Sequence, residues 1–339
     1  MPSSSIFILG EAWGAEEERE RMPFVGPTGW ELTRLLTEAG IPRNECFLSN
    51  VFNFRPPGGK LENLCGPAPE GIRGYGPVIP GHYVSAQYQP EIDRLGEELL
   101  AVDPNLIIAF GNTALWAVWN KTAIKKFRGT TFITTHAASG FKALATYHPA
   151  AIFRDWSLRP VVIADLQKAH RESTFPDIRR VYRELWIEPT EDDVYEFCER
   201  FIPGASMLSV DIETAGRRVT CIGFAPSPSR AIVIPFDHPR KFGRNYWPTP
   251  EIEVRIWKRI RSVLVNPSPP KIFQNGLYDT AFLARAYGVK VAGSLHDTML
   301  LHHALQPEST KDLGFLGATY ANEMAWKHMR ARKTTKRED

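Results

Sequence analysis

Two carboxylates stand two positions apart at the end of an apolar stretch, Ser-Val-Asp-Ile-Glu-Thr, and this spacing could bind a metal ion. Alternate residues of a β-strand point to the same face, so Asp211 and Glu213 would lie side by side. Neighbouring carboxylates repel each other unless a cation lies between them. A third acid, Asp279, begins a helical segment after a later strand. The pair indicates metal binding, and an Asp-x-Glu that arises by chance is the alternative.

A second group of candidate residues lies in an acidic loop between Gly10 and Gly26. Glycines at both ends allow the backbone to approach a ligand closely. The loop follows an apolar strand, which places Glu11 at the carboxyl end of that strand, where α/β folds build their sites. This position favours chemistry on a bound ligand, and the alternative is an acidic surface loop with a structural Pro-Phe turn.

Strands and helices alternate through the first half of the chain and would position this loop. Short apolar runs predict strands over 6–9, 47–52, 106–110 and 143–147. Helical spacing of apolar residues predicts helices over 29–39, 111–119 and about 150–171. Such alternation favours a mostly parallel sheet in an α/β fold. The segment 58–89 is rich in glycine and proline, has no sustained period and is expected to be a functional or disordered loop.

The second half has a different rhythm. Three strands are predicted in succession, over 207–212, 219–225 and 231–235, after a strand over 185–187 and a helix over 191–201. A helix is then predicted over 251–265, a strand over 271–274 and a helix over 279–287. Leu295 leads into a further helix that ends at Leu305. Antiparallel strands followed by this alternation favour a mixed sheet with flanking helices. We place the domain boundary between Thr174 and Arg183, which gives domains over 1–175 and 183–327.

The composition sets broad limits. A chain of 339 residues is long for one core, so two domains are expected. The net charge of +3 does not by itself indicate nucleic-acid binding, although the basic tail over 328–339 is either solvated or an arm that touches phosphate. None of the four cysteines forms a Cys-x-x-Cys pair, and no apolar stretch is long enough to span a membrane. We therefore expect a cytoplasmic protein without a membrane partner.

Four ordered segments of the first half resemble the iron–sulfur type of uracil-DNA glycosylase. The first is the loop 10–26, which begins Gly-Glu-Ala and ends Pro-Phe-Val-Gly. The others are Ala39-Gly40-Ile41 with Arg43, Ser49-Asn50-Val51 leading to Arg55-Pro56-Pro57, and Tyr147-His148-Pro149-Ala150 with Arg154. Each motif alone is weak, but four in order over about 150 residues are specific. The resemblance implies a three-layer, parallel-sheet glycosylase-like fold.

The resemblance also implies roles for individual residues. Glu11 would be the catalytic acid that positions or activates water, and His148 would sit against uracil O2. Phe24 would stack on a base flipped out of the DNA. Breaking an N-glycosidic bond builds positive charge on the sugar and negative charge on the departing base, which a carboxylate and a hydrogen-bond donor stabilise. The implied substrate-binding residues are Ala12, Gly14, Glu17, Phe24, Asn50 and Gly59.

Three departures from that family affect these expectations. Gly59 stands where the family has a second asparagine that reads the hydrogen-bonding edge of uracil, so base specificity is open. Phe54 stands where the family has a cysteine, no cysteine precedes Cys46, and Cys65 alone cannot hold a cluster that takes four ligands. We therefore predict no iron–sulfur cluster. Trp13 replaces a proline and could reshape the pocket.

The second half resembles the DEDD 3′–5′ exonucleases attached to family A DNA polymerases. The matching segments begin at Ser209, Gln274, His296 and Lys311, within a region from about Arg183 to Lys327. The resemblance implies a ribonuclease H-like mixed-sheet fold and two Mg²⁺ or Mn²⁺ ions that activate water and stabilise the leaving oxygen. The implied ligands, which would also be catalytic, are Asp211, Glu213 and Asp279. Asp297 is expected to have a structural role.

The fourth acid of that family is missing from its Tyr-x-x-x-Asp motif, because Met324 stands four residues after Tyr320. We therefore expect weak or absent exonuclease activity. The domain order resembles the front end of certain bacteriophage family A DNA polymerases, with the polymerase domain lost or encoded separately. The predicted function is excision of uracil or a damaged base, with 3′-end trimming of DNA in a bacterial host. The alternative is a catalytically weak module that grips single-stranded DNA or 3′ ends beside a polymerase.

Overall fold

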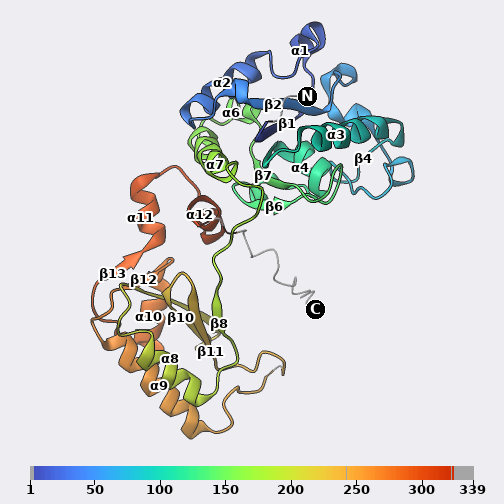
Figure 1. Cartoon of the computed structure of the whole chain (residues 1–339). Coiled ribbons are helices and arrows are strands. Elements are labelled where there is room, and N and C mark those ends of the chain that lie inside the picture. The colour runs from blue at the N-terminus through green and yellow to red at the C-terminus, as the bar shows by residue number, and fades with distance from the viewer. Residues whose placement is uncertain (1–3, 242, 322, 324–339) are drawn as a thin grey trace. The chain divides into compact units, whose positions relative to one another are not determined.

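The computed structural model describes residues 4–241, 243–321 and 323, which form two compact units. Figure 1 shows both and labels many of their helices and strands. Of the described residues, the first unit comprises 4–178 with 312–321 and 323, and the second comprises 179–241 with 243–311. The region expected as a second domain, 183–327, therefore includes helix α12 (Leu313–Tyr320), which the structure packs with the first unit. The basic tail over 328–339 lies outside the described residues.

The first unit is built on a five-stranded sheet with strand order β2-β1-β5-β7-β6. All neighbouring strands run parallel except β6, which pairs antiparallel with β7. The strands are β1 (Ile6–Ala12), β2 (Cys46–Phe52), β5 (Leu106–Phe110), β6 (Thr131–Ile133) and β7 (Lys142–Thr146). The helices are α1 (Ala15–Glu20), α2 (Pro27–Glu38), α3 (Gln89–Val102), α4 (Gly111–Trp119), α5 (Ile124–Phe127), α6 (Pro149–Ile152), α7 (Leu158–Glu172) and α12.

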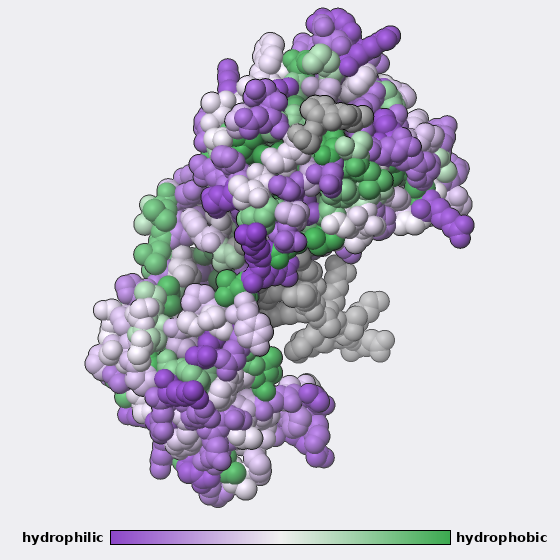
Figure 2. Space-filling view, viewed as in Figure 1, coloured by the Kyte–Doolittle hydropathy of each residue, from purple (hydrophilic) through white to green (hydrophobic). Residues whose placement is uncertain are grey.

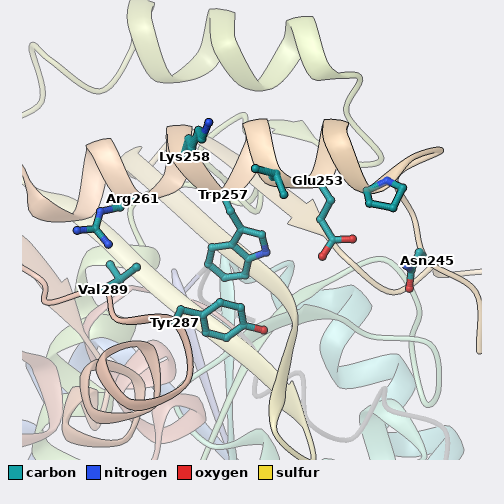
Figure 3. Close-up of a pocket in the computed structure, with 9 residues that line it drawn as sticks. Asn245, Glu253, Trp257, Lys258, Arg261, Tyr287 and Val289 are labelled. Carbon is teal, nitrogen blue, oxygen red and sulfur yellow. The ribbon is translucent and has the colours of Figure 1, made fainter.

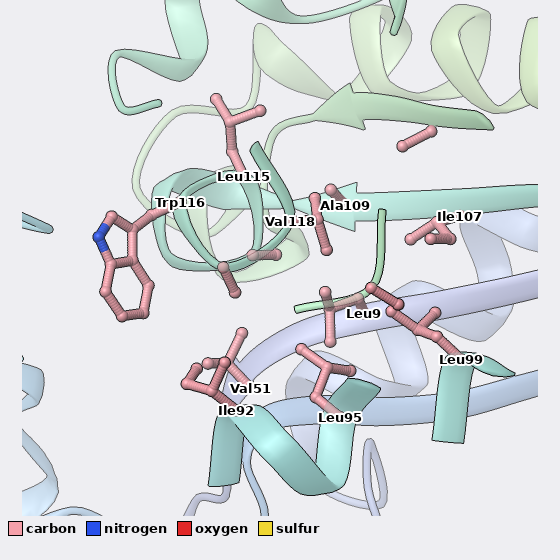
Figure 4. Close-up of a cluster of buried hydrophobic side chains, with 14 of the residues drawn as sticks. Leu9, Val51, Ile92, Leu95, Leu99, Ile107, Ala109, Leu115, Trp116 and Val118 are labelled. Carbon is pink, nitrogen blue, oxygen red and sulfur yellow. The ribbon is translucent and has the colours of Figure 1, made fainter. Parts of the chain in front are cut away.

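Helices cover both faces of this sheet because its central strands are buried on both sides. Phe7 and Leu9 of β1 pack with α3 and α4, and Figure 4 shows this cluster around Leu95, Leu99 and Val118. The intervening residue, Ile8, belongs to a separate cluster on the other face with α2 and α7. Continuous apolar runs such as Leu106–Phe110 are typical of parallel strands buried in this way. The predicted three-layer α/β fold is confirmed.

Two details of the first unit differ from the sequence expectations. Strand β1 continues to Ala12, beyond its predicted end at Leu9, and Glu11 lies at its carboxyl end as predicted. The helix expected from about 150 to 171 is divided into α6 and α7. Asp155 Oδ1 accepts hydrogen bonds from Ser157 N at 3.1 Å and Ser157 Oγ at 2.6 Å. This local turn competes with the helical backbone bonds and interrupts the helix.

The segment expected to be an irregular loop forms several short elements. It contains the two-stranded pair β3 (Cys65–Gly66) and β4 (Tyr83–Val84) and four 3₁₀ helices. Tyr75 fixes part of it to α4, because its hydroxyl donates to Ala117 O at 3.1 Å. The 3₁₀ helices are η2 (Pro57–Gly59), η3 (Leu61–Leu64), η4 (Ala68–Glu70) and η5 (Ala86–Tyr88), and η1 (Arg43–Glu45) lies before β2.

The second unit has a six-stranded mixed sheet with strand order β13-β12-β9-β10-β11-β8. Strands β9, β10 and β11 pair antiparallel, whereas β12 runs parallel to β9 and to β13, and β8 runs parallel to β11. The predicted mixed-sheet domain is confirmed. The strands are β8 (Glu184–Trp186), β9 (Leu208–Ala215), β10 (Arg218–Ser227), β11 (Arg230–Pro235), β12 (Lys271–Phe273) and β13 (Leu295–Asp297). The helices are α8 (Glu191–Arg200), α9 (Pro250–Val265), α10 (Gly276–Tyr287) and α11 (Thr298–Leu305).

Helix α11 presents an apolar surface to solvent. Leu300, Leu301 and Leu305 are 59%, 52% and 73% exposed. Figure 2 shows hydrophobic residues gathered over this helix. Exposed apolar residues that cluster in this way often mark contact surfaces. None of the helices formed by the described residues combines the length and apolar character needed to cross a membrane.

Candidate active sites

A cavity of about 210 Å³ lies at the carboxyl ends of β1 and β2. The structure brings all eight residues predicted for the first site to its walls, although they come from widely separated segments. Trp13, Thr28, Pro56 and Leu61 also line the cavity and were not among the predicted site residues. The predicted residues found there are Glu11, Ala12, Gly14, Glu17, Phe24, Asn50, Gly59 and His148.

Glu11 is held by a side chain that the sequence did not reveal. Thr113 Oγ1 donates a hydrogen bond of 2.5 Å to Glu11 Oε2. Thr113 is buried in the first turns of α4, directly after the carboxyl end of β5. The neighbouring strand end could have indicated it, because parallel strands bring their carboxyl ends to one edge of the sheet. The bond leaves the other oxygen of Glu11 available to a ligand or water.

Glu17 holds the acidic loop together. Its Oε2 accepts from Gly14 N at 3.1 Å, and its Oε1 accepts from Gly26 N at 3.0 Å. Glu17 is only 9% exposed, so Gly14 and Gly26, on either side of α1, are fixed to one buried carboxylate. Although Glu17 lines the cavity as predicted, its two oxygens are engaged with the protein backbone. The geometry favours a positioning role over direct contact with substrate.

Two glycines leave space for Phe24, and one of them also leaves space for Asn50. A Cβ on Gly10 would lie 2.2 Å from Asn50 Oδ1 and 2.6 Å from Phe24 Cζ, so a side chain at this position would displace both. Gly29 touches the backbone of Phe24 in the same way, with its Cβ position 1.8 Å from Phe24 O. Phe24 itself has a positive φ of 58°, and Arg43 fixes this conformation by donating to Phe24 O at 2.8 Å.

Arg94 of α3 fixes the end of β2 that carries Asn50. Its guanidinium donates to Asn50 O at 2.8 Å and to Val51 O at 3.1 Å. It also pairs with Glu91 and Glu98 on its own helix. The planar fork of arginine suits such multiple bonds and leaves little freedom to the strand end. Arg94 lies outside the four resembling motifs, and sequence reasoning did not identify it.

His148 is a neutral hydrogen-bond donor in this site. Burial lowers its pKa to about 4, and the positive charge of Arg154 adds to this effect while Glu17 opposes it. Ala150 N donates to His148 Nδ1 at 3.3 Å, at the start of α6. A neutral imidazole that accepts at Nδ1 carries its proton on Nε2. His148 can therefore donate from Nε2 to an oxygen of a ligand without carrying charge.

Gly59 leaves open space where a side chain could be added. Its φ is 67°, and a Cβ there would approach nothing nearer than Arg55 Nε and Nη2, both at 3.7 Å. Asparagine adopts this left-handed conformation more readily than other residues with a side chain. The pocket therefore lacks an amide at Gly59, although its backbone and its surroundings would accept one.

The cysteines of the first unit do not fit an iron–sulfur cluster. Cys46 and Cys65 are its two cysteines, and each donates to a carbonyl four residues earlier, Pro42 O and Leu61 O, at 3.5 Å. Burial raises the pKa of Cys46 to about 12 and also raises that of Cys65, so both are thiols at neutral pH. A cluster takes four thiolates. Phe54, at the family's cysteine position, instead stacks on Tyr88 with ring centroids 5.7 Å apart.

The second predicted site lies around the end of β9. Asp211 and Glu213 are exposed on one face of the strand, and the alternating residues Val210 and Ile212 are buried in the core. Asp279 lies in the first turn of α10 and is buried, and its Oδ1 accepts from Ile212 N at 3.1 Å. Burial raises the pKa of Asp279, and the nearby negative charges of Asp297 and Glu213 raise it further.

Asp297 serves as a backbone anchor. It accepts from Met299 N at 2.8 Å, which caps α11, and from Asn275 N at 3.1 Å and Gly276 N at 2.8 Å. Its oxygens are thus committed to the protein. Across the described residues, no three His, Cys, Asp or Glu side chains form a group that could hold a metal ion. Asp211, Glu213 and Asp279 are oxygen ligands of suitable chemistry, but they are not assembled as a metal centre here.

Comparison with known proteins matches each half of the chain separately. Residues 1–179 match the uracil DNA glycosylase superfamily, and residues 187–337 match a 3′–5′ exonuclease family. The type-4 uracil-DNA glycosylase of Thermotoga maritima is 33% identical over 168 residues, which are 48% of this chain and 75% of that protein. A DNA polymerase of Bacillus phage SP01 is 22% identical over 326 residues, which are 88% of this chain but 32% of the polymerase.

The crystal structure of Trypanosoma brucei RNase D with RNA U12 shares 18% identity, covers 42% of this chain and 48% of that one, and has a TM-score of 0.33.

Proposed function

We propose that this chain, which belongs to the uracil DNA glycosylase superfamily, excises uracil or a damaged base from DNA by hydrolysing the N-glycosidic bond. Its glycosylase domain is fused to a 3′–5′ exonuclease domain, and homology to a phage DNA polymerase covers most of the chain. These relationships support a role in DNA processing. The observation that carries the proposal is the single cavity that gathers Glu11, Asn50 and His148.

The groups in the cavity suit this reaction. When the bond between C1′ and the base nitrogen breaks, its electron pair leaves with the base and the sugar becomes positively charged. Glu11 faces the sugar charge as a carboxylate and positions the water that adds to C1′, and the proton that this water releases neutralises the departing base anion. His148 donates from Nε2 to the base oxygen that gains negative charge. Phe24 offers its ring to the flipped base, and Asn50 offers its amide to the base or sugar.

The excision rate should not fall as the pH is lowered through 6.5. The pKa of His148 is lowered to about 4, so the neutral donor persists until the pH falls towards that value. Single-turnover excision measured from pH 4 to pH 8 tests this expectation. A decline with a midpoint near 6.5, absent from His148→Gln, would contradict the assigned protonation state.

Gly59→Asn should increase discrimination for uracil over cytosine by about tenfold or more, because a well-placed amide contributes on the order of 1–3 kcal/mol of base discrimination. The left-handed backbone and the open space at Gly59 accept the new side chain. Excision rates on matched oligonucleotides with one uracil or one cytosine give the ratio. Gly59→Ala is the control, since it adds a side chain without an amide. Equal ratios in the two variants would argue against a base-reading role for this position.

The proposed excision is tested directly with a 5′-labelled single strand that contains one internal deoxyuridine. The reaction contains EDTA, which silences any metal-dependent nuclease, and hot alkali then cleaves abasic sites. Cleavage at the uracil position alone supports the glycosylase. An intact strand at high protein concentration would exclude excision under these conditions and favour the DNA-binding alternative.

For the second domain we propose weak or absent 3′–5′ exonuclease activity. The departure from the family's Tyr-x-x-x-Asp motif, with Met324 four residues after Tyr320, supports this proposal. Residual activity would depend on Mg²⁺ or Mn²⁺ at Asp211, Glu213 and Asp279. The second candidate function, a module that holds single-stranded DNA or 3′ ends beside a polymerase, is favoured by the same departure and by Gly59. Degradation of a 3′-recessed primer with Mn²⁺ at a rate typical of proofreading would overturn the proposed impairment.

A further inference from the structure

The side chain of Trp13 lies in the wall of the cavity that also contains Glu11. Trp13 stands two positions after Glu11, directly beyond the end of β1. Its backbone N donates to Phe54 O at 3.2 Å, a bond that a proline at this position could not form. The backbone of Trp13 is therefore fixed beside the segment that leads to Gly59.

The indole N–H of Trp13 is buried without a hydrogen-bond partner. Among the residues that the structure describes, none accepts a bond from Trp13 Nε1. A buried N–H without an acceptor has lost its bonds to water and gained none from the protein, so it raises the free energy of the empty site. A ligand that brings an acceptor to this N–H recovers that loss.

Other tryptophans show how an indole N–H is ordinarily accommodated. Trp116 Nε1 donates to Gly76 O at 2.8 Å, and Trp186 Nε1 donates to a carboxylate oxygen at 2.7 Å. Trp247 resembles Trp13, because its Nε1 also lacks a partner within the described part of the chain. Trp247 belongs to the core of the second unit, however, whereas the ring of Trp13 lines the first site.

A tryptophan can also line a cavity for structural reasons, as Trp257 does in the second unit. It borders a cavity of about 350 Å³, and Figure 3 shows its ring above that of Tyr287. These two ring centroids lie 4.1 Å apart, and Phe236 stacks on Trp257 with centroids 4.6 Å apart. Packing on neighbouring rings explains the position of Trp257. For Trp13, the unpartnered N–H in the wall of the first site indicates a ligand.

The other polar groups of the first cavity limit what that ligand can be. His148 offers one donor, the N–H at Nε2, and Glu11 keeps one oxygen that Thr113 does not occupy. Glu17 offers neither oxygen, because both accept bonds from the backbone. The N–H of Trp13 is thus a further donor in the walls. A base with two carbonyl oxygens can accept from both His148 and Trp13.

Uracil and cytosine differ in the group that this donor could read. Cytosine carries an amino group at position 4, which donates, whereas uracil carries a carbonyl oxygen there, which accepts. When His148 donates to O2 of uracil, O4 is the carbonyl oxygen that remains for Trp13. In cytosine the amino group would meet the indole N–H as a second donor, and neither donor would be satisfied.

We propose that Trp13 selects uracil over cytosine by donating its indole N–H to O4 of the flipped base. The ring turns as the base enters and carries Nε1 from the wall into the cavity, a kind of side-chain rotation that is common on binding. Trp13 thereby reads the edge of the base at a site where Gly59 has no side chain to do so. The inference rests on the proposed excision of uracil and adds to it the residue that selects the base.

The test measures binding of the full chain to fluorescein-labelled single strands by anisotropy. Each strand carries one central 2′-fluoro-2′-deoxynucleotide, with uracil or cytosine as its base, because the fluorine disfavours positive charge on the sugar and keeps the glycosidic bond intact. The wild type should prefer uracil. Trp13→Phe should reduce this preference about tenfold, since one well-placed donor supplies discrimination of that order. Trp247→Phe removes an unpartnered N–H from the second unit and should leave the preference unchanged.

A purely structural role for Trp13 gives a different result. Uracil and cytosine have the same shape, so a loss of bulk or of folding weakens binding to both strands and leaves their ratio unchanged. Adding Gly59→Asn to Trp13→Phe should restore the preference, because an amide can both donate to and accept from the base edge. A wild-type ratio in Trp13→Phe would overturn the inference, as would equal affinity of the wild type for the two strands.

Excision assays on the same variants separate this inference from the proposed function. Strands with unmodified deoxyuridine, treated with hot alkali after the reaction, report on excision. If the wild type excises nothing but prefers uracil in binding, and Trp13→Phe removes that preference, the excision proposal fails and base selection by Trp13 stands. If the wild type excises uracil while Trp13→Phe keeps the preference, base selection by Trp13 fails and excision stands.

Discussion

Glu11→Gln should reduce single-turnover excision of uracil by about two to three orders of magnitude, the usual cost of removing one electrostatic stabiliser from a buried site. The substitution keeps the shape of the side chain and the hydrogen bond from Thr113, so the cavity should remain intact. It removes the negative charge that faces the sugar when the glycosidic bond breaks. The measurement is excision from a deoxyuridine strand in EDTA, with enzyme in excess so that product release has no effect.

Thr113 supplies a graded control for this result. Thr113→Val removes the hydroxyl that donates to Glu11 Oε2, without changing the size of the side chain, and should lower the rate by a smaller factor than Glu11→Gln. Thr113→Ser keeps the hydroxyl and should restore most of the rate. Oligonucleotide affinity should stay close to wild type in all three variants. Full activity in Glu11→Gln would show that the catalytic charge comes from another residue.

The main features of the first site could be predicted from the sequence because parallel strands bring their carboxyl ends together. Glu11 and Asn50 lie near the carboxyl ends of apolar strands that pair in the sheet, and Gly10 aligns directly with Asn50 across β1 and β2. His148 follows the end of β7, which lies in the same sheet. Strand periodicity and chain order were therefore sufficient to place these residues at one edge.

Other parts of the site depend on contacts between segments that have no local pattern. Arg94 reaches β2 from the face of a helix, and Thr113 reaches Glu11 from 102 positions away. In the sequence, Glu17 looks like an ordinary surface charge, because it lies in an acidic run with other glutamates. Only the structure shows that it accepts hydrogen bonds from two loop amides. Side-chain packing decides these roles, and helical or strand periodicity carries no information about them.

In the second domain too, some features could be predicted from the sequence and others could not. The two-residue spacing of Asp211 and Glu213 correctly placed both on one face of β9, because strand geometry is local. The position of α12 was not predictable in this way. Its sequence matches the exonuclease-type region, yet its buried face packs with the first unit, where Lys168 Nζ donates to Ala318 O at 3.0 Å. A short apolar helix fits several surfaces, and buried polar partners determine which one it occupies.

Asp165→Ala should destabilise the first unit by about 3–5 kcal/mol, because it leaves the guanidinium of Arg128 buried without its partner. Arg128 and Asp165 are 2% and 1% exposed, and they form a two-bonded ion pair. Asp165 also accepts from Thr146 Oγ1 at 2.7 Å, at the end of β7, and Arg128 donates to Thr319 of α12 at 3.0 Å. The loss should appear in urea unfolding as a lower midpoint and in thermal unfolding as a fall of about 10 °C.

Comparison with two other variants separates a buried-charge effect from simple loss of packing. Arg200→Ala breaks the exposed pair with Glu196 and should cost about 0.5 kcal/mol or less, since solvent screens such pairs. The double substitution of Arg128→Met with Asp165→Leu removes both charges together, so no unpaired ion remains. It should therefore be more stable than Asp165→Ala, even though it changes more atoms. If the double variant is the less stable of the two, the pair itself holds α7, β7 and α12 together, and the cost of burying its charges is smaller than the energy of its bonds.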